Sequence, residues 1–242
     1  MVKRLSSGLA FKANYSYSKV LDLNSQLDSA YSLNAPSDIL NPYNTGLNKG
    51  PATFDLRQQF NLNFGYELPF GRGKRWGGGA SGIVDKLMSG WQWNGIVQVQ
   101  PGFPFTPTVG SNRSGSGDTN NPDVPNRNPA FSGPVILGRS DRWFNPNAFL
   151  LPAAGTFGNA GRNQFIGPGL RALDTSLFKR IPINERWNLQ FRAEVFNILN
   201  HTNFGPPILG VFSGASFSPS AGAITTTATS SRQIQFALKL SF

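Results

Sequence analysis

The sequence lacks cysteine altogether, and it contains little charge and a single histidine. Without cysteine it can form no disulfide framework, no thiolate nucleophile and no cysteine-ligated zinc site. Charged residues make up 14% of the chain, whereas a typical soluble domain has about 25%. Acidic clusters with the spacing of metal ligands are absent too. We therefore expect neither a metal ion nor another cofactor.

Long apolar runs are also missing. No stretch reaches the roughly 18 apolar residues of a membrane-spanning helix, which excludes a transmembrane helix. A concentrated basic surface is missing as well, although the formal net charge is +10. The tightest basic cluster is Arg72, Lys74 and Arg75, and no predicted helix carries a basic stripe. These patterns argue against nucleic-acid binding.

Alternation of apolar and polar residues is the strongest pattern present, and it is clearest at residues 232–242. Successive side chains of a strand point to opposite faces, so one face of this segment is wholly apolar. Its apolar positions are Ile234, Phe236, Leu238, Leu240 and Phe242. The length suits a tilted membrane-spanning strand of roughly 9–11 residues. An aromatic last residue in register with the apolar face resembles the C-terminal signature that the insertion machinery of bacterial outer-membrane barrels recognises.

Five further segments repeat this alternation, and the connections between them differ systematically in length. The segments are residues 8–19, 54–68, 90–100, 170–181 and 187–196. The first, third and fifth connections are long and polar: 20–53, 104–168 and 197–231. The fourth connection is very short, and the second is intermediate with a possible helical piece at 83–88. Antiparallel strands place odd and even connections on opposite sides, as long external loops and short periplasmic turns require.

We therefore predict an all-β fold, an antiparallel transmembrane β-barrel segment whose C-terminus is periplasmic. About six strands are fewer than the roughly eight of the smallest bacterial single-chain barrels, and an open edge in lipid would leave backbone groups unsatisfied. Export also requires a signal peptide, but Ser6, Ser7 and Lys12 interrupt the apolar core that such a signal needs. Residues 1–242 are therefore expected to be either one part of a larger barrel or a protomer of a multi-chain barrel. We favour the first, with a natural start upstream of Met1.

Several phrases carry a resemblance to a known family. They are S-K-V-L-D at 18–22, W-F-N-P-N-A-F at 143–149, G-T-F-G-N-A-G-R-N at 155–163, D-T-S-L-F-K-R at 174–180, L-Q-F-R-A-E-V-F-N-I-L-N-H-T-N-F-G at 189–205 and the last eleven residues. Together they resemble the C-terminal part of TonB-dependent outer-membrane receptors, specifically the Oar-like group that bears a carboxypeptidase regulatory domain. The resemblance covers nearly the whole chain and is most specific from Trp143 onward.

The resemblance implies a barrel of about 22 strands with a plug in its lumen, in the outer membrane of a Gram-negative bacterium. It implies uptake of a nutrient or polymer, driven by a TonB-type energy transducer that contacts the N-terminal part. The plug, the regulatory-like domain and that contact segment are absent from residues 1–242. The implied partners of this chain are therefore outer-membrane lipid and the barrel insertion machinery, with no nucleic acid. The transported substrate cannot be read from the sequence.

Among polar residues of the predicted strands, Arg192 and Glu194 share the inward face of one strand. They are candidate lumen charges, because a charge near the middle of the lipid face costs about 2–4 kcal/mol. We interpret them as a charge pair that satisfies neighbouring strands. The basic stretch 71–79 has glycines but lacks the spacing of a phosphate-binding loop. We interpret it as a turn near anionic lipid headgroups.

In the predicted loops, His201 is a candidate only if a nucleophile and an orienting group lie beside it. We expect it to be a polar loop residue and the chain to be no enzyme. Asp118, Asn120 and Asp123 are a weak candidate site for Ca²⁺ or sugar, and a solvated loop is the simpler interpretation. The aromatic residues Trp143, Phe144 and Phe149 serve either ligand contact or packing. The alternative functions are a soluble all-β carbohydrate-binding module and an outer-membrane hydrolase that uses His201.

Overall fold

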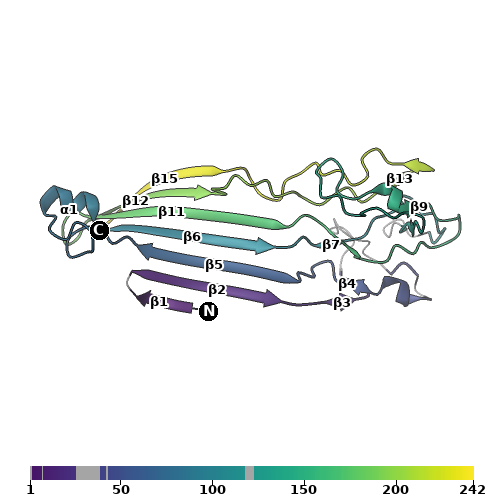
Figure 1. Cartoon of the computed structure of the whole chain (residues 1–242), viewed down its shortest axis with the longest axis horizontal. Helices are drawn as coiled ribbons and strands as arrows, with labels where there is room; N and C mark the ends of the chain where they lie inside the picture. Colours follow the sequence, from purple (N-terminus) through teal and green to yellow (C-terminus); the bar gives the residue numbers. More distant parts are fainter. Residues whose placement is uncertain (1, 7, 26–38, 42, 118–122) are drawn as a thin grey trace.

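A single antiparallel sheet forms one half of the molecule, and packed loops form the other half (Figure 1). The computed structural model describes residues 2–6, 8–25, 39–41, 43–117 and 123–242. The 7-stranded sheet has the order β1-β2-β5-β6-β11-β12-β15. Its strands are β1 (Val2–Ser6), β2 (Leu9–Tyr17), β5 (Gln58–Glu67), β6 (Trp91–Gln100), β11 (Leu170–Pro182), β12 (Asn188–Phe196) and β15 (Gln233–Ser241). Each strand pairs with the next along the chain among these seven, so the sheet is a simple meander.

Smaller elements lie in the connections. Four pairs of two-residue strands are β3 (Leu21–Asp22) with β4 (Gly50–Pro51), β7 (Pro104–Phe105) with β10 (Phe165–Ile166), β8 (Asn126–Arg127) with β9 (Phe149–Leu150), and β13 (Phe212–Ser213) with β14 (Ser216–Phe217). The helices are η2 (Thr45–Asn48), α1 (Gly82–Met88) and η3 (Pro146–Ala148). None of the helices that the structure describes is long and apolar enough to cross a membrane.

The six strands predicted from alternation are all present, but the expected number of about six is too low by one. The additional strand is β1, which pairs with β2 through the register Val2↔Lys12 and Ser6↔Leu9. This segment was not predicted as a strand, because its five residues are too few and too mixed to show a period of two. Its sequence was interpreted as an interrupted signal sequence. The segment forms a strand because its backbone pairs with the neighbouring strand β2.

The register across the sheet collects the apolar side chains on one side, which we call the apolar face. One row runs from Ala13 through Leu62 to Val97 and Leu173. Another row places Phe191 against Leu238. Gly95 lies in this face opposite Phe64, whose ring occupies the space where a Cβ at position 95 would sit. The ring of Phe64 then meets Trp93 edge-on, with centroids 4.9 Å apart.

The opposite side, which we call the polar face, carries mainly amide, hydroxyl and charged side chains. Its rows join Asn14 to Asn61 and Gln98, and Asn94 to Ser176 and Glu194. Ile96 is an apolar exception, paired with Asn63 and Asp174 as the alternation predicted. Both faces remain partly accessible in the strands, so neither is covered by a second layer of the described chain.

Connection lengths alternate between the two ends of the sheet, as predicted. The short connections and α1 lie at one end, the turn end, together with the C-terminus (Figure 1). The segment 83–88, predicted as a possible helical piece, is helical within α1. The described residues of the three long connections, 18–57, 101–169 and 197–232, extend together from the other end. We call their described residues the loop cap and this end of the sheet the loop end.

The buried hydrophobic core lies in the loop cap and not against the sheet. Its largest side chains are Phe105, Phe144 and Phe149, which are almost fully buried. Ring centroids 5.6–6.0 Å apart link these three with Phe165. The other members are Leu40, Val109, Val124, Ala148, Ala160, Val211, Phe212 and Ala221. The connections were predicted to be polar loops, but a shared aromatic core makes them one packed body.

Candidate functional site at the polar face and loop cap

The polar face is lined by side-chain amides that bond to one another along and across strands. Gln59 Nε2 donates to Gln100 Oε1 at 3.3 Å, and Gln92 Nε2 donates to Asn94 Oδ1 at 2.9 Å. Amides present donors and acceptors side by side, so they can exchange partners with a hydrated solute. The face therefore suits contact with polar solutes and water.

Arg192 and Glu194 both lie on this polar face, near the middle of β12. Arg192 is in register with Phe178 and Ala237, and Glu194 with Ser176 and Gln235. The expected charge pair does not form among the described residues. Arg192 instead donates from Nε and an Nη atom to Gln190 Oε1 at 3.0 and 2.9 Å, and its guanidinium lies 5.0 Å from the centre of the Phe178 ring. A planar guanidinium can stack and hydrogen-bond at once, which explains its choice of partners.

The C-terminal strand β15 presents the predicted stripe. Ile234, Phe236, Leu238 and Leu240 are in register with the apolar residues of β12, and they are between 48% and 70% exposed. Phe242 extends the stripe beyond the strand, where its ring packs on Trp187 with centroids 5.2 Å apart. Such exposure of large apolar side chains marks a surface that contacts lipid or another protein segment.

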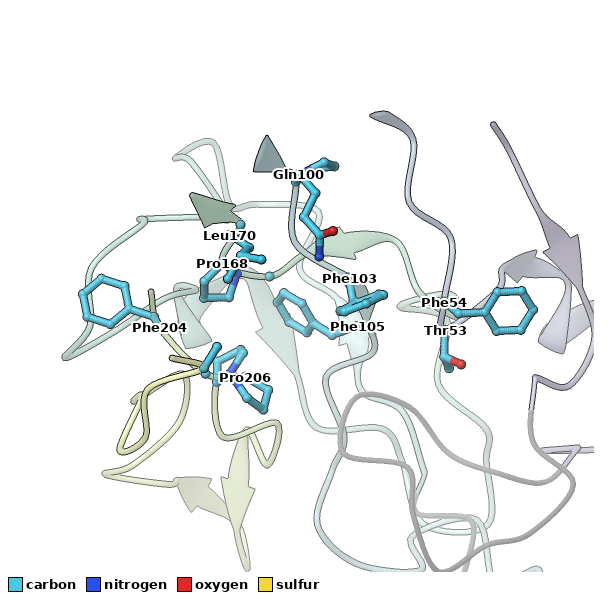
Figure 2. A pocket seen from close by; sticks show the side chains of 15 residues that line it. Thr53, Phe54, Gln100, Phe103, Phe105, Pro168, Leu170, Phe204 and Pro206 are labelled. Atoms are coloured by element: carbon cyan, nitrogen blue, oxygen red, sulfur yellow. The ribbon is translucent and has the colours of Figure 1, made fainter. Parts of the chain in front are cut away.

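A cavity of about 440 Å³ opens where the polar face meets the loop cap (Figure 2). Its edge is formed by Gln100 and Leu170, the paired end residues of β6 and β11. Its walls are mostly apolar and come from all three long connections. They include Phe54, Phe103, Phe105, Pro168, Phe204 and Pro206. The cavity is large enough for a small organic group and lies beside the polar face.

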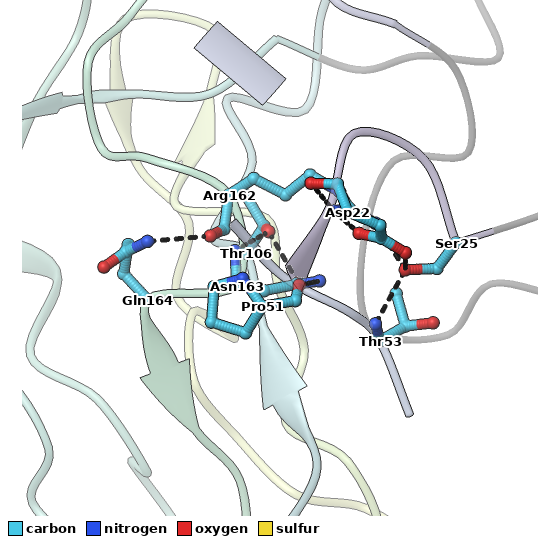
Figure 3. Close-up of polar contacts among 8 residues, drawn as sticks. All are labelled: Asp22, Ser25, Pro51, Thr53, Thr106, Arg162, Asn163 and Gln164. Carbon is cyan, nitrogen blue, oxygen red and sulfur yellow. Dashed lines mark hydrogen bonds and ion pairs between the residues drawn. The ribbon is translucent and has the colours of Figure 1, made fainter. Parts of the chain in front are cut away.

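A buried ion pair joins two of the connections near this cavity (Figure 3). Arg162, with its side chain 5% exposed, forms a salt bridge to Asp22 and donates to Ser25 Oγ at 2.5 Å. The next residue, Asn163, adopts a left-handed φ of 54° and donates from Nδ2 to Pro51 O at 2.8 Å. Thr106 Oγ1 fixes that conformation by accepting from Asn163 N at 2.8 Å. These contacts hold the connection 18–57 against the connection 101–169.

Two other ion pairs of the loop cap have arginines that are more exposed than Arg162. Asp55 accepts from Arg57 Nε at 2.7 Å, and this hydrogen bond raises the pKa of Arg57 above its ordinary value. Arg139 bonds Asp141, and its hydrogen bond lowers the pKa of the Asp141 carboxyl. Asp55 also accepts from Val20 N at 2.8 Å through its other oxygen, so it fastens the start of the first connection.

The weak Ca²⁺ or sugar site predicted at 118–123 is not supported at the residue that can be assessed. Asp118 and Asn120 lie outside the described residues. Asp123 is fully buried and accepts from Ser114 Oγ at 2.9 Å and from the Ser114 backbone N–H. Its carboxylate therefore organises the loop, whereas the sequence suggested a solvated position.

Two of the three loop aromatics serve packing alone. Phe144 and Phe149 have 0% exposure in the core, and Trp143 lies partly buried at its edge. The Trp143 indole N–H donates to Ile166 O at 3.0 Å. Their segment is closed by Asn145, whose side chain accepts from Asn147 N at the start of η3. The sequence left ligand contact and packing open, and the geometry decides for packing at Phe144 and Phe149, whereas Trp143 also lines an open groove.

His201 lies exposed on the loop cap, where Asn197 holds its backbone in both directions. Asn197 Oδ1 accepts from His201 N at 3.0 Å, and Asn197 Nδ2 donates to His201 O at 3.0 Å. Within the described chain, its imidazole makes no hydrogen bond to a hydroxyl or carboxylate, so the arrangement of a catalytic triad is not assembled there. The described residues also contain no group of three or more acidic or histidine side chains that could hold a metal ion.

At the turn end, the basic stretch 71–79 folds as a compact turn against α1. Asp85 accepts from Arg72 N at 2.7 Å, and the Phe70 and Trp76 rings stack with centroids 5.3 Å apart. The apolar side chains of Ile83, Val84 and Leu87 are between 56% and 77% exposed on α1. The turn thus combines basic and exposed apolar residues, in keeping with the predicted position near lipid headgroups.

Sequence reasoning missed the residues that assemble the loop cap, such as Arg162, Asn163 and Phe105. Their partners lie far away in the sequence, 57 residues for the Thr106–Asn163 bond and 140 for the Arg162–Asp22 pair. The one available signal was the phrase at 155–163, which stood out by resemblance and contains Arg162 and Asn163.

Comparison with known proteins gives one family. The family model described as "Outer membrane beta barrel domain" matches residues 1–235, which is nearly the whole chain. No curated protein and no solved structure matches the chain. The match agrees with the all-β sheet, its apolar face and its alternating connections, and it places the protein in the outer membrane. The chain belongs to the outer membrane β-barrel domain family.

Proposed function

We propose that the chain is a wall segment of a TonB-dependent outer-membrane receptor of the Oar-like group, from a Gram-negative bacterium. The observation that carries this proposal is the packed loop cap beside the polar face, with a cavity between them. The phrases that resemble the receptors build this cap: residues 143–149 supply Phe144 and Phe149, and residues 155–163 supply Arg162. A receptor needs such a rigid external surface to select its solute.

In this proposal the polar face lines the lumen, and the apolar face contacts lipid. Arg192 and Glu194 then stand as lumen charges along the path of a nutrient or polymer. The energy for uptake enters through a plug and a TonB-type transducer that contacts the N-terminal part of the receptor. This chain supplies the wall and the loops, and its β15 stripe supplies the signal for the insertion machinery.

The two edge strands support a larger barrel. β1 and β15 are the outer strands of the sheet and each has one partner among the described strands. An unpaired strand edge in lipid leaves backbone donors and acceptors without partners, at several kcal/mol for each group. We propose that further strands of the same receptor pair with both edges and close a barrel of about 22 strands.

We propose that the chain has no catalytic activity and binds no nucleic acid. The imidazole of His201 lacks the neighbours that a hydrolase needs among the described residues, and the basic side chains lie at several separate places. Membership of an outer-membrane family also favours the barrel over a soluble carbohydrate-binding module.

An antibody against residues 143–163 tests the proposal in the source cells. The expected result is an outer-membrane polypeptide much larger than 26.3 kDa that co-purifies with the TonB-type transducer. A matched control removes the transducer gene, after which uptake should stop while the polypeptide stays in the membrane. A single band at 26.3 kDa, or uptake that persists without the transducer, would contradict the proposal.

A further inference from the structure

Charge on the apolar face is confined to β11 among the strands whose side chains the structure describes. Arg171 lies at its loop end and Lys179 at its turn end, in register with Val99 and Trp91 respectively. Arginine near the middle of the lipid costs about 2–4 kcal/mol, but little near the interface. Both residues are thus placed at the two membrane interfaces.

These two cations differ in the hydrogen-bond and ion-pair partners that they have within the described chain. Lys179 is 3% exposed, donates to the carbonyls of Leu87 and Ser89, and lies 5.2 Å from the centre of the Trp91 ring. Arg171 is exposed, and its guanidinium makes no ion pair or hydrogen bond within the described chain. Its charge is therefore available to a ligand outside the chain.

The backbone of Arg171 is held in place by a buried amide. Asn203 is 1% exposed; its Oδ1 accepts from Arg171 N at 2.8 Å, and its Nδ2 donates to Arg171 O at 3.1 Å. β12 does not pair with β11 beside Arg171, so the Asn203 side chain takes the place of a neighbouring strand there. The connection 197–232, which contains His201, is thereby fixed beside Arg171.

Arg171 borders a groove of about 750 Å³ on the apolar side of the loop end. Its floor is a row of the sheet, Tyr15, Phe60 and Val99, that ends at Arg171. Trp143 and His201 border the groove from the loop cap. Arg57 also lines it, but its charge is offset by Asp55. We call this the rim groove.

We propose that the rim groove binds the phosphate-bearing headgroup of an outer-leaflet lipid. The Arg171 guanidinium can donate two parallel hydrogen bonds to a phosphate, which is a geometry that phosphate and carboxylate ligands favour. The acyl chains then lie along the apolar face below Phe60 and Val99, while Tyr15 and Trp143 occupy the interfacial level. Charge, aromatic position and apolar floor thus match the three parts of one lipid. This inference goes beyond the proposed uptake function and rests only on its membrane orientation, with the apolar face in lipid and the loop end outward.

Native mass spectrometry of the full-length protein in detergent tests the site, with lipid A as the probe and dephosphorylated lipid A as its matched control. We expect lipid A to bind, and Arg171→Ala to weaken that binding about tenfold, the value of one charge-assisted hydrogen bond. Arg171→Lys should retain part of the affinity, because it keeps the charge and loses the fork. Arg180→Ala, on the polar face, should bind as the wild type does.

Three outcomes would overturn the inference. The first is equal binding of lipid A and its dephosphorylated form. The second is unchanged binding by Arg171→Ala when heat-modified gel mobility shows the variant to be folded. The third is displacement of lipid A by millimolar inorganic phosphate, since the site would then be one for a soluble anion.

Discussion

At the scale of single residues, the ion pairs of the loop cap differ mainly in burial. The Arg162–Asp22 pair has side chains 5% and 23% exposed, whereas the Arg139–Asp141 pair is 65% and 64% exposed. Breaking a buried pair leaves a desolvated charge without a partner, but an exposed pair is screened by water on both sides. The two pairs therefore provide matched tests of what fastens the cap.

Arg162→Ala should loosen the connection 18–57 from the connection 101–169. We expect a loss of about 3 kcal/mol in the stability of the loop cap, because Asp22 and Ser25 lose their shared donor. Limited proteolysis of intact cells should then cleave the loops faster, with the sheet still protected. Arg139→Ala should leave the cleavage rate nearly unchanged, at about 0–1 kcal/mol. Equal protection of the wild type and Arg162→Ala would show that the ion pair does not fasten the cap.

Phe144→Ala tests whether the loops share one core. Phe144 is fully buried among Phe105 and Phe149, so its removal leaves a cavity and should cost about 3–5 kcal/mol. Hydrogen exchange should rise throughout the loop cap and stay unchanged in β6 and β11. Tyr43→Ala is the control, because that side chain is 98% exposed. Faster exchange limited to residues next to position 144 would contradict a shared core.

At the scale of elements, the strands were predictable and the loop cap was not. A strand such as β15 repeats its pattern every two residues, so nine residues suffice to show both faces. β1 is shorter and depends on its neighbour, so its sequence alone carries too little pattern. The cap's aromatic residues occur at irregular spacings, and ring partners such as Phe105 and Phe144 lie far apart in the sequence, so no local period indicates them. Asp123 shows the same limit, since only the fold reveals that it is buried.

The two faces of β15 predict opposite responses to one substitution. Phe236→Lys places a charge on the apolar face near the middle of the strand and should destabilise the barrel by about 2–4 kcal/mol. Gln235→Lys, on the polar face, should change stability by much less. Urea unfolding of the full-length barrel in lipid vesicles measures both. Similar losses for the two variants would mean that the apolar face does not contact lipid.

At the scale of the whole molecule, the buried core lies in the loops and not against the sheet. The sheet contains no second layer among the described residues, while the loops contain the densest packing. In the proposed receptor, a membrane supplies the missing layer on the apolar face, and a lumen with its contents supplies it on the polar face. The loop cap, in the same proposal, faces water and must keep its shape there, which explains why the aromatic core lies in it.

The most direct test of this account is the labelling of single introduced cysteines, because the chain has none of its own. Ala215→Cys lies in the exposed turn between β13 and β14 of the loop cap, and Ser81→Cys lies just before α1 at the turn end. With other cysteines removed from the full-length protein, a membrane-impermeant maleimide should label position 215 in intact cells. Position 81 should be labelled only after the outer membrane is permeabilised. Labelling of both positions in intact cells, or of position 81 alone, would contradict an outer-membrane barrel with external loops.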